Sequence, residues 1–276
     1  SGSPSKRNLS TSGCCQHPIG VCKMSPLVIR VRFALPWSRL RYQSLHFSGD
    51  GAIVAEGDSL ALLRAMPSHS VSLILTDPPY GIGEAAGKNA SRGNMAVAKD
   101  YGDDGWDDQP VDPALMALVR AAGRWNIIFG GNYYDCPPAS CWLVWDKENG
   151  SNDFADCELA WTNLPKAVRR IKFMWNGMLR KNGEPRGDHP TQKPIELYQW
   201  LLMNYAEPLD TILDTHLGSG SSRIAAYDLG FDFTGYELDT DYYLAQEKRF
   251  AEHLAQPKLF SSTQVELHQE GLFLRG

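Results

Sequence analysis

The chain has 276 residues, is 43% hydrophobic and carries a formal net charge of −5, which suits one large globular domain or one domain with an insertion. No apolar run approaches the ~20 residues that a membrane-spanning helix needs, and no secretory signal pattern is visible, so we expect no membrane segment and a cytoplasmic location. The negative charge excludes nucleic-acid binding through overall charge, so a polyanion would have to be held by a local basic patch.

Residues 1–50 form a basic N-terminal segment that we expect to be flexible. Ser1-Gly2-Ser3 resembles an expression-tag remnant, and the first ~25 residues are rich in Ser, Gly, Pro and Cys without hydrophobic periodicity. Residues 1–49 contain seven of the 27 basic residues and none of the 32 acidic ones. The remaining chain, residues 50–276, therefore carries a net charge of −12.

The six cysteines give no sign of a metal site. None of them forms a C-x-x-C pair, so the sequence indicates neither a zinc site nor a disulfide framework, and we expect no metal. One N-terminal group could in principle gather a metal: Cys14, Cys15, His17 and Cys22. Reduced thiols in a poorly ordered tail are the simpler interpretation.

From Ala52 onward the sequence alternates between strand and helix patterns. The expected strands are 53–56, 71–75, 125–129, 140–146, 157–162, 211–214 and 231–236. The expected helices are 60–65, 113–122, 194–205 and 221–229. This alternation predicts an α/β fold with a doubly wound, mostly parallel sheet.

We expect the main domain to occupy residues 51–256, with 257–276 as a C-terminal tail. Residues 81–110 are rich in Gly, Asn and Asp without a sustained apolar period, which predicts a long mobile loop. Residues 163–188 are expected to form a small insertion.

A rigid corner follows the strand that ends near residue 75. Its sequence is TDPPYGIG, residues 76–83, in which Pro78 and Pro79 forbid helix because they fix φ and lack a backbone N–H donor. The corner therefore holds Asp77 and Tyr80 at the end of a buried strand. The alternative is a purely structural proline-rich turn in which the acid is held by its surroundings and has no catalytic role.

A second pattern, over residues 212–239, predicts a nucleoside pocket. It consists of a strand, a Gly/Ser turn, a helix, a second strand and an acid. Gly218 and Gly220 allow a tight turn close to a ligand, and Glu237 stands where a carboxylate can accept the hydroxyls of a ribose. Arg223 replaces the third glycine of the dinucleotide fingerprint, and the turn has no Lys-Ser/Thr, so a ligand without phosphates fits better.

Three motifs together carry a family resemblance: DPPY at 77–80, HPTQKP at 189–194, and the Asp214–Gly220 turn. In this order they resemble the amino-group DNA methyltransferases of the β class, from about Ala52 to Phe250. The resemblance implies a Rossmann-like methyltransferase fold with permuted motif order, S-adenosyl-L-methionine (AdoMet) as cofactor and double-stranded DNA as substrate. It also makes a homodimer plausible. Residues 163–188 would be the target-recognition insertion.

The resemblance also implies roles for individual residues. Asp77, the Pro78 carbonyl, Pro79 and Tyr80 would form the catalytic corner, which grips the exocyclic amine and stacks on the flipped base. The expected cofactor contacts are Asp58, Ser59, Asp77, Thr191, Lys193, Asp214, His216, Leu217, Gly218, Ser219, Gly220, Glu237 and Leu238. The family usually has Pro-Phe after the motif's Asp, whereas this chain has Thr215-His216.

A basic stretch between Pro165 and Gly187 is the candidate DNA-binding region. It holds one acid and seven basic residues, Lys166, Arg169, Arg170, Lys172, Arg180, Lys181 and Arg186. Trp175 and Asn176 are interleaved with these residues, and the stretch as a whole is the candidate for phosphate contacts and base readout. A solvated basic loop is the alternative.

The favoured activity is transfer of a methyl group from AdoMet to the N6 of a flipped adenine. N4-cytosine methylation uses the same geometry, and Asp at position 77, where that activity often has Ser, favours adenine. C5-cytosine methylation needs a cysteine nucleophile, normally after proline, and the chain has no Pro-Cys pair. Protein-glutamine or RNA methylation is disfavoured by the motif order, and a non-catalytic nucleotide- or DNA-binding module remains the alternative from another class.

Overall fold

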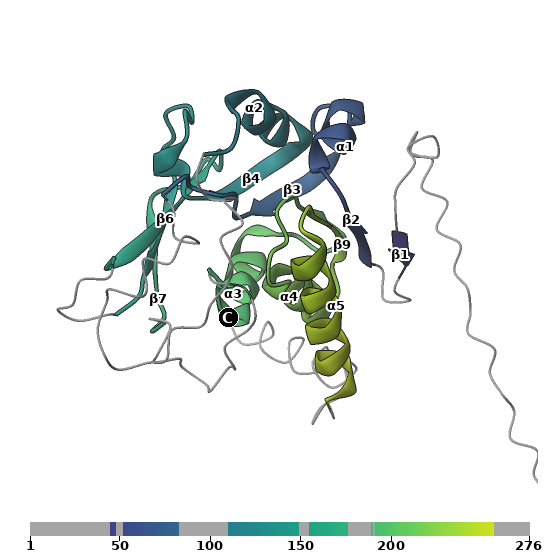
Figure 1. Cartoon of the computed structure of the whole chain (residues 1–276). Helices are drawn as coiled ribbons and strands as arrows, with labels where there is room; N and C mark the ends of the chain where they lie inside the picture. The colour runs from purple at the N-terminus through teal and green to yellow at the C-terminus, as the bar shows by residue number, and fades with distance from the viewer. Residues whose placement is uncertain are drawn as a thin grey trace, which may run out of the picture. The chain divides into compact units, whose positions relative to one another are not determined.

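The computed structural model describes residues 45–47, 52–82, 110–148, 155–175, 189 and 191–256 (Figure 1). The chain divides into two units, and all the described residues belong to the second, Leu40–Gly276. Predictions for the cysteines before residue 25, for most of the 81–110 loop and for the 257–276 tail lie outside the described residues. In the part that is described, no helix has both the length and the apolar character needed to cross a membrane.

The described chain forms one nine-stranded sheet with helices on both faces. The strands are β1 (Leu45–Phe47), β2 (Ala52–Glu56), β3 (Val71–Thr76), β4 (Gly123–Phe129), β5 (Trp142–Asp146), β6 (Cys157–Thr162), β7 (Arg169–Lys172), β8 (Thr211–Asp214) and β9 (Asp232–Glu237). The helices are α1 (Ser59–Ala65), α2 (Pro113–Ala122), α3 (Ile195–Tyr205), α4 (Ser221–Leu229) and α5 (Thr240–Ala255), with a short 3-10 turn at Gly131–Tyr133.

The strand order is β1-β2-β9-β8-β3-β4-β6-β5-β7. Strands β2, β9, β8, β3 and β4 pair in parallel, whereas β1 and β6 run against their neighbours. The sheet is therefore mostly parallel and its faces are covered by helices, which confirms the predicted α/β fold class.

Alternation along the central strand β3 supplies a core on both faces of the sheet. Leu73 and Leu75 belong to one apolar cluster with Leu197 and Leu201 of α3, while Ile74 between them is also fully buried. Helix α1 packs on α2, and α3 packs on α4. Figure 1 shows α1 and α2 on one side of the sheet and α3, α4 and α5 on the other. Both faces are covered, so the strands read as continuous apolar runs.

The connections reverse direction between β3 and β8. The β3-α2-β4 unit extends the sheet to one side and the β8-α4-β9 unit extends it to the other, while β3 pairs directly with β8. Ligands of open α/β sheets bind outside the carboxyl ends of the strands at such a switch point. Asp77 follows β3 and Asp214 ends β8, so both acids stand at this crevice.

Most predicted elements are confirmed to within two residues at each end, and three more appear that the patterns did not place: β1, β7 and α5. Helix α5 packs against β9 and α4, and β7 pairs in parallel with β5 at the far edge of the sheet. Strand β7 lies in the segment predicted as an insertion. Arg169 to Lys172 thus extend the main sheet, whereas residues 176–188 lie outside the described part of the chain.

Truncating the buried face of α3 should destabilise the fold. Leu201 is 1% exposed, so Leu201→Ala should lower the free energy of unfolding by about 2–5 kcal/mol through lost apolar burial and the cavity left behind. Met203 on the same helix is 62% exposed, and Met203→Ala should change it by no more than about 0.5 kcal/mol. Urea unfolding measures both. Equal losses in the two variants would contradict the assignment of the buried face.

Candidate functional site

The corner after β3 lies at the switch-point crevice, where it stands between the two halves of the sheet. Tyr80 forms an isolated antiparallel bridge with Pro110, so both ends of the predicted 81–110 loop are joined beside the corner. Gly81 has φ +71°, a left-handed conformation that glycine adopts without strain. The chain can therefore turn away from the sheet directly after Tyr80.

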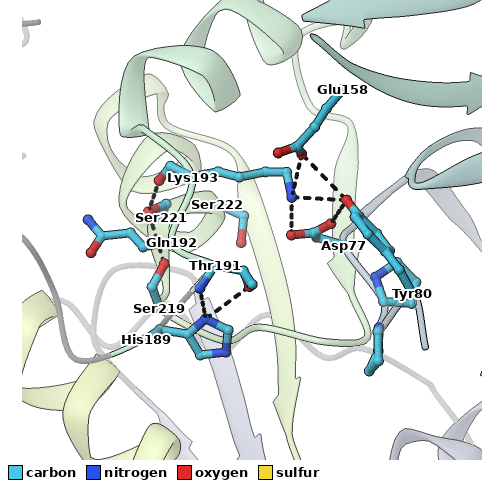
Figure 2. A network of polar contacts seen from close by, with 12 residues as sticks. Asp77, Tyr80, Glu158, His189, Thr191, Gln192, Lys193, Ser219, Ser221 and Ser222 are labelled. Carbon is cyan, nitrogen blue, oxygen red and sulfur yellow. Dashed lines mark hydrogen bonds and ion pairs between the residues drawn. The ribbon is translucent and has the colours of Figure 1, made fainter. Parts of the chain in front are cut away.

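Asp77 and Tyr80, which are partly buried, form a polar network with the buried Lys193 (Figure 2). The Tyr80 hydroxyl donates to Asp77 Oδ1 at 2.6 Å, and the Lys193 ammonium contacts Asp77 Oδ2. Lys193 Nζ also lies 3.2 Å from the Tyr80 hydroxyl oxygen, and its side chain is only 4% exposed. The predicted catalytic acid is thus fixed by donors on both of its oxygens.

Glu158 of β6 is a second carboxylate on the same ammonium. Glu158 Oε2 lies 3.1 Å from Lys193 Nζ, and Glu158 Oε1 pairs with the ammonium of Lys147, which follows β5. In Figure 2 the Lys193 side chain runs from the loop before α3 toward the space between Glu158 and Asp77. Positive and negative groups therefore alternate along the chain of contacts Lys147, Glu158, Lys193 and Asp77.

Burial and these charges shift the pKa values of the network in different directions. Burial raises the pKa of Asp77, although Lys193 opposes the rise. Burial also acts to raise the pKa of Glu158, but the ammoniums of Lys193 and Lys147 outweigh it and lower that pKa to about 2. For Lys193 burial is outweighed by Asp77 and Glu158, which raise its pKa. Lys193 and Glu158 are therefore charged at neutral pH.

Two tyrosines after β4 hold the corner in place. The Tyr134 hydroxyl lies 2.7 Å from the Pro78 carbonyl oxygen and 2.8 Å from that of Pro79. The Tyr133 ring stacks on Tyr80, with centroids 5.0 Å apart and an angle of 14° between the planes. A Cβ at Gly130 would collide with the Tyr80 ring, so only glycine allows this approach.

The predicted cofactor half lies at the carboxyl ends of β8 and β9. Gly218 and Gly220 have φ of +52° and +73°, and Glu237 Oε2 accepts the Gly218 N–H at 2.7 Å. Glu237 Oε1 accepts the Asp239 N–H at 3.0 Å. Each carboxylate oxygen offers two lone pairs, so Glu237 can still accept from ligand hydroxyls.

Asp214 is buried beneath the glycine turn. Its Oδ2 accepts from the Ser222 hydroxyl at 2.6 Å, and its Oδ1 accepts from the His216 N–H at 3.1 Å. Burial raises the pKa of Asp214 to about 7, against the effect of these hydrogen bonds. With this pKa the buried carboxyl is partly protonated near neutral pH.

The 189–194 segment joins the two halves of the site. The Ser221 hydroxyl donates to the Lys193 carbonyl oxygen at 2.7 Å, next to the glycine turn, while the Lys193 side chain reaches the Asp77 corner. Thr191 contacts His189, which packs over Gly218 and against the Tyr242 ring. Figure 2 shows Thr191 and His189 on the side of the network that faces Ser219. The segment therefore spans both predicted sites.

The remaining predicted cofactor residues also follow the parallel strands. Asp58 caps α1 by accepting the Leu60 N–H at 2.8 Å. Burial lowers the pKa of His216 to about 4, and the charge of Asp58 opposes this effect. Ser59 is buried in α1, and Leu217 N donates to the Tyr236 carbonyl at 2.8 Å. Leu238 is 71% exposed directly after Glu237. Thus Thr215-His216, the departure from the family pattern, keeps a neutral imidazole at this edge.

Four of the seven predicted DNA contacts lie on described residues, Lys166, Arg169, Arg170 and Lys172. The other three lie outside them, Arg180, Lys181 and Arg186. Arg170 and Lys172 on β7 are more than half exposed and lie 3.8 Å and 3.9 Å from Asp146 Oδ2. Lys166 donates to the Asn204 carbonyl at 3.3 Å.

Trp175, which is interleaved with the basic residues, belongs to the core. This residue is 6% exposed and donates its indole N–H to the Gln192 carbonyl at 3.0 Å, so its ring is unavailable to a base. An aromatic side chain within a basic stretch carried no signal that distinguished a core anchor from a DNA contact. Asn176 lies outside the described residues.

Sequence reasoning missed three residues that complete the corner: Lys147, Glu158 and Tyr134. A charged residue inside the strand pattern of β6 was the available signal for Glu158, because an acid at a strand position near a core needs a partner. Tyr134 and Lys147 follow β4 and β5, and nothing in their local sequence indicates which group they contact.

Removing the Tyr134 hydroxyl should loosen the corner. Tyr134→Phe leaves the Pro78 and Pro79 carbonyls without this donor, so the free energy of unfolding should fall by about 1 kcal/mol. Tyr133→Phe is the matched control, because it keeps the ring that stacks on Tyr80. Denaturant unfolding of both variants tests this. The hydroxyl does not hold the corner if Tyr134→Phe is as stable as the control.

The raised pKa of Asp214 predicts a pH-dependent stability. Between about pH 4 and pH 7 the folded protein keeps this proton and the unfolded chain loses it, so the free energy of unfolding falls as pH rises. Asp214→Asn removes that loss, so its stability relative to the parent should rise by about 1 kcal/mol per pH unit across this window. Unfolding curves at pH 4, 5.5 and 7 measure the difference. At pH 4 the difference in stability between Asp214→Asn and the parent reflects only the replacement of the carboxyl group by an amide. If that difference in stability is the same at all three pH values, the raised pKa of Asp214 is refuted.

Comparisons with known proteins agree with this geometry. A family model described as DNA methylase, of the N6/N4 type, matches residues 137–248. The type II methyltransferase M2.LlaDCHI of Lactococcus lactis subsp. cremoris is 24% identical over 250 residues, covering 74% of this chain and 91% of that protein. The type II methyltransferase M2.DpnII of Streptococcus pneumoniae is 23% identical over 249 residues, with the same coverage.

Two solved structures resemble this chain over most of its length. The M1.HpyAVI–SAM complex has a TM-score of 0.45 and 19% identity, covering 72% of this chain and 99% of that chain. The cytosine-N4-specific PvuII DNA methyltransferase has a TM-score of 0.46 and 17% identity, covering 78% and 90%. The family model and the two curated relatives confirm the resemblance to DNA methyltransferases that the motifs predicted.

Proposed function

We propose that this protein transfers a methyl group from AdoMet to the exocyclic N6 of a flipped adenine in double-stranded DNA. One observation carries the proposal: the Asp77 corner and the glycine turn stand at the carboxyl ends of the adjacent strands β3 and β8. A carboxylate and a main-chain carbonyl thus lie beside a pocket suited to a nucleoside.

The residues at β8 and β9 fit the proposed cofactor. Glu237 can accept ribose hydroxyls, and Asp214 is a buried acid that a cationic amino group of the methionine moiety would hold ionised. The glycines at 218 and 220 keep the turn free of side chains, so a ligand can approach the backbone. When bound, AdoMet supplies an electrophilic methyl group on its sulfonium sulfur.

The Asp77 corner would then activate the amine. The lone pair of the adenine amine is delocalised into the ring, which makes the nitrogen a poor nucleophile. Asp77 and the Pro78 carbonyl can accept the two N–H protons and favour a pyramidal nitrogen whose lone pair points at the methyl group. The N–C bond forms as the C–S bond breaks, and the extra proton leaves the nitrogen afterwards. Positive charge that develops on nitrogen strengthens both hydrogen bonds in the transition state.

Tyr80 would hold the extrahelical base. Flipping costs a few kcal/mol, and stacking on an aromatic ring can return about 1–3 kcal/mol. Tyr133 already stacks on one face of the Tyr80 ring, so the base must take the other face or displace Tyr133. The exposed basic residues of β7 are proposed phosphate contacts for the duplex.

The target base separates the proposal from its alternatives. The protein is incubated with unmethylated genomic DNA and AdoMet, and the nucleosides are then separated by mass. N6-methyladenine at one short motif is the expected product. N4-methylcytosine alone would assign the same geometry to cytosine, and no methyl transfer at all would favour a non-catalytic DNA-binding module.

Removing the catalytic acid should abolish transfer without removing the cofactor site. Asp77→Ala takes away one of the two amine acceptors, so kcat should fall by at least about 100-fold, while AdoMet affinity stays within a few-fold. Labelled-methyl transfer and calorimetric titration of AdoMet measure the two effects. Asp241→Ala, at an exposed acid in the first turn of α5, is the control with unchanged transfer. Full activity in Asp77→Ala would remove the proposed mechanism.

A further inference from the structure

The Lys193 ammonium forms an ion pair with Asp77, the proposed catalytic acid, in this structure. It contacts Asp77 Oδ2, while the Tyr80 hydroxyl takes Asp77 Oδ1. An ionised carboxylate has about four acceptor positions, so the amine of a target base can still be accepted. It would, however, bind beside a fixed positive charge.

That positive charge opposes the proposed reaction. The target nitrogen becomes positive as the methyl group is transferred, and like charges a few ångströms apart in a buried site repel one another. A lysine paired with Asp77 alone would weaken Asp77 as an acceptor and also disfavour the transition state. A second anion on Lys193 is therefore needed at this point.

Glu158 supplies that anion. Glu158 Oε2 lies 3.1 Å from Lys193 Nζ, and the pairing of Oε1 with Lys147 fixes the carboxylate from the opposite side. Glu158 stands in β6, opposite Trp145 of β5, so its backbone is held by the sheet. The sheet and Lys147 thus hold Glu158 from the side away from Asp77, and the Tyr80 hydroxyl lies 3.5 Å from Glu158 Oε2 on the other side.

We propose that Glu158 is a positioning residue for the methyl transfer inferred above, and that it acts through Lys193. It holds the ammonium when the target amine docks on Asp77, and it offsets the ammonium charge as the nitrogen becomes positive. Glu158 itself touches neither the base nor the cofactor in this scheme. The Lys193 ammonium contacts both carboxylates in this structure, so Glu158 can keep it in place when the target amine binds Asp77.

The charges around Asp77 define a pH signature for this role. Lys193, Glu158, Tyr80, Asp214 and Tyr198 all face the Asp77 carboxylate. Glu158 raises the pKa of Asp77 and Lys193 lowers it, after the larger effect of burial. Asp77 accepts the amine as a carboxylate, so the acid limb of kcat follows this pKa. Removing Glu158 should move the limb to lower pH, and removing Lys193 should move it to higher pH.

The test uses the full chain and measures kcat against pH for the parent, Glu158→Gln, Lys193→Met and the double variant. Glu158→Gln should lower kcat roughly 10-fold or more, move the acid limb to lower pH and leave AdoMet affinity unchanged. In the Lys193→Met background the same change should cause little further loss of kcat at pH values above the acid limb, because the proposed positioning acts through the lysine. Thermal unfolding confirms that each variant is folded, and Glu252→Gln, on the exposed end of α5, is the matched control.

Two results would overturn the inference. One is a Glu158→Gln variant with parental kcat and an unmoved acid limb, and the other is a loss of kcat that is equally large without Lys193. The pH profile of Glu158→Gln decides by itself if the lysine variants do not fold, since glutamine keeps the size of the side chain. A parent protein that transfers no methyl group would instead refute the proposed function, so the two failures are distinguishable.

Discussion

The pairing of β3 with β8 is the contact on which the site depends. These strands are 139 positions apart in the chain, and Leu73 and Ile74 lie directly opposite Ile212 and Leu213. Side chains reinforce the pairing at both ends, because Ser72 N donates to the Thr211 hydroxyl at 3.1 Å and the Thr76 and Thr215 hydroxyls lie 3.1 Å apart. A shift of this register would separate the Asp77 corner from the Asp214 turn, because each follows its strand directly.

Much of this arrangement could be predicted from sequence, because its determinants are local. The two prolines after a buried strand fix the corner, and the glycines between β8 and α4 fix the turn with positive φ. Strand and helix periodicity then predicted the sheet and the edge at which the motifs meet. Strand β7 gave no such signal, because Arg169 to Lys172 form an edge strand with little buried surface.

The contacts of long side chains could not be predicted in the same way. Lys193 was expected beside the cofactor, and its backbone does lie next to the glycine turn, but its ammonium reaches the opposite half of the site. Four methylene groups allow that reach, and only the three-dimensional positions of Asp77 and Glu158 select the direction. Trp175 gave no signal of its place for the same reason, since it stands within a basic stretch of the sequence while its side chain belongs to the apolar core.

The bridge between Tyr80 and Pro110 has a consequence for divergence within such a fold. It joins the two ends of the intervening segment next to the stacking ring, so the ends stay fixed whatever length of chain lies between them. Closing a longer loop costs little, about 0.6 kcal/mol for each doubling of length. Substitutions and insertions there can therefore accumulate without moving the catalytic corner.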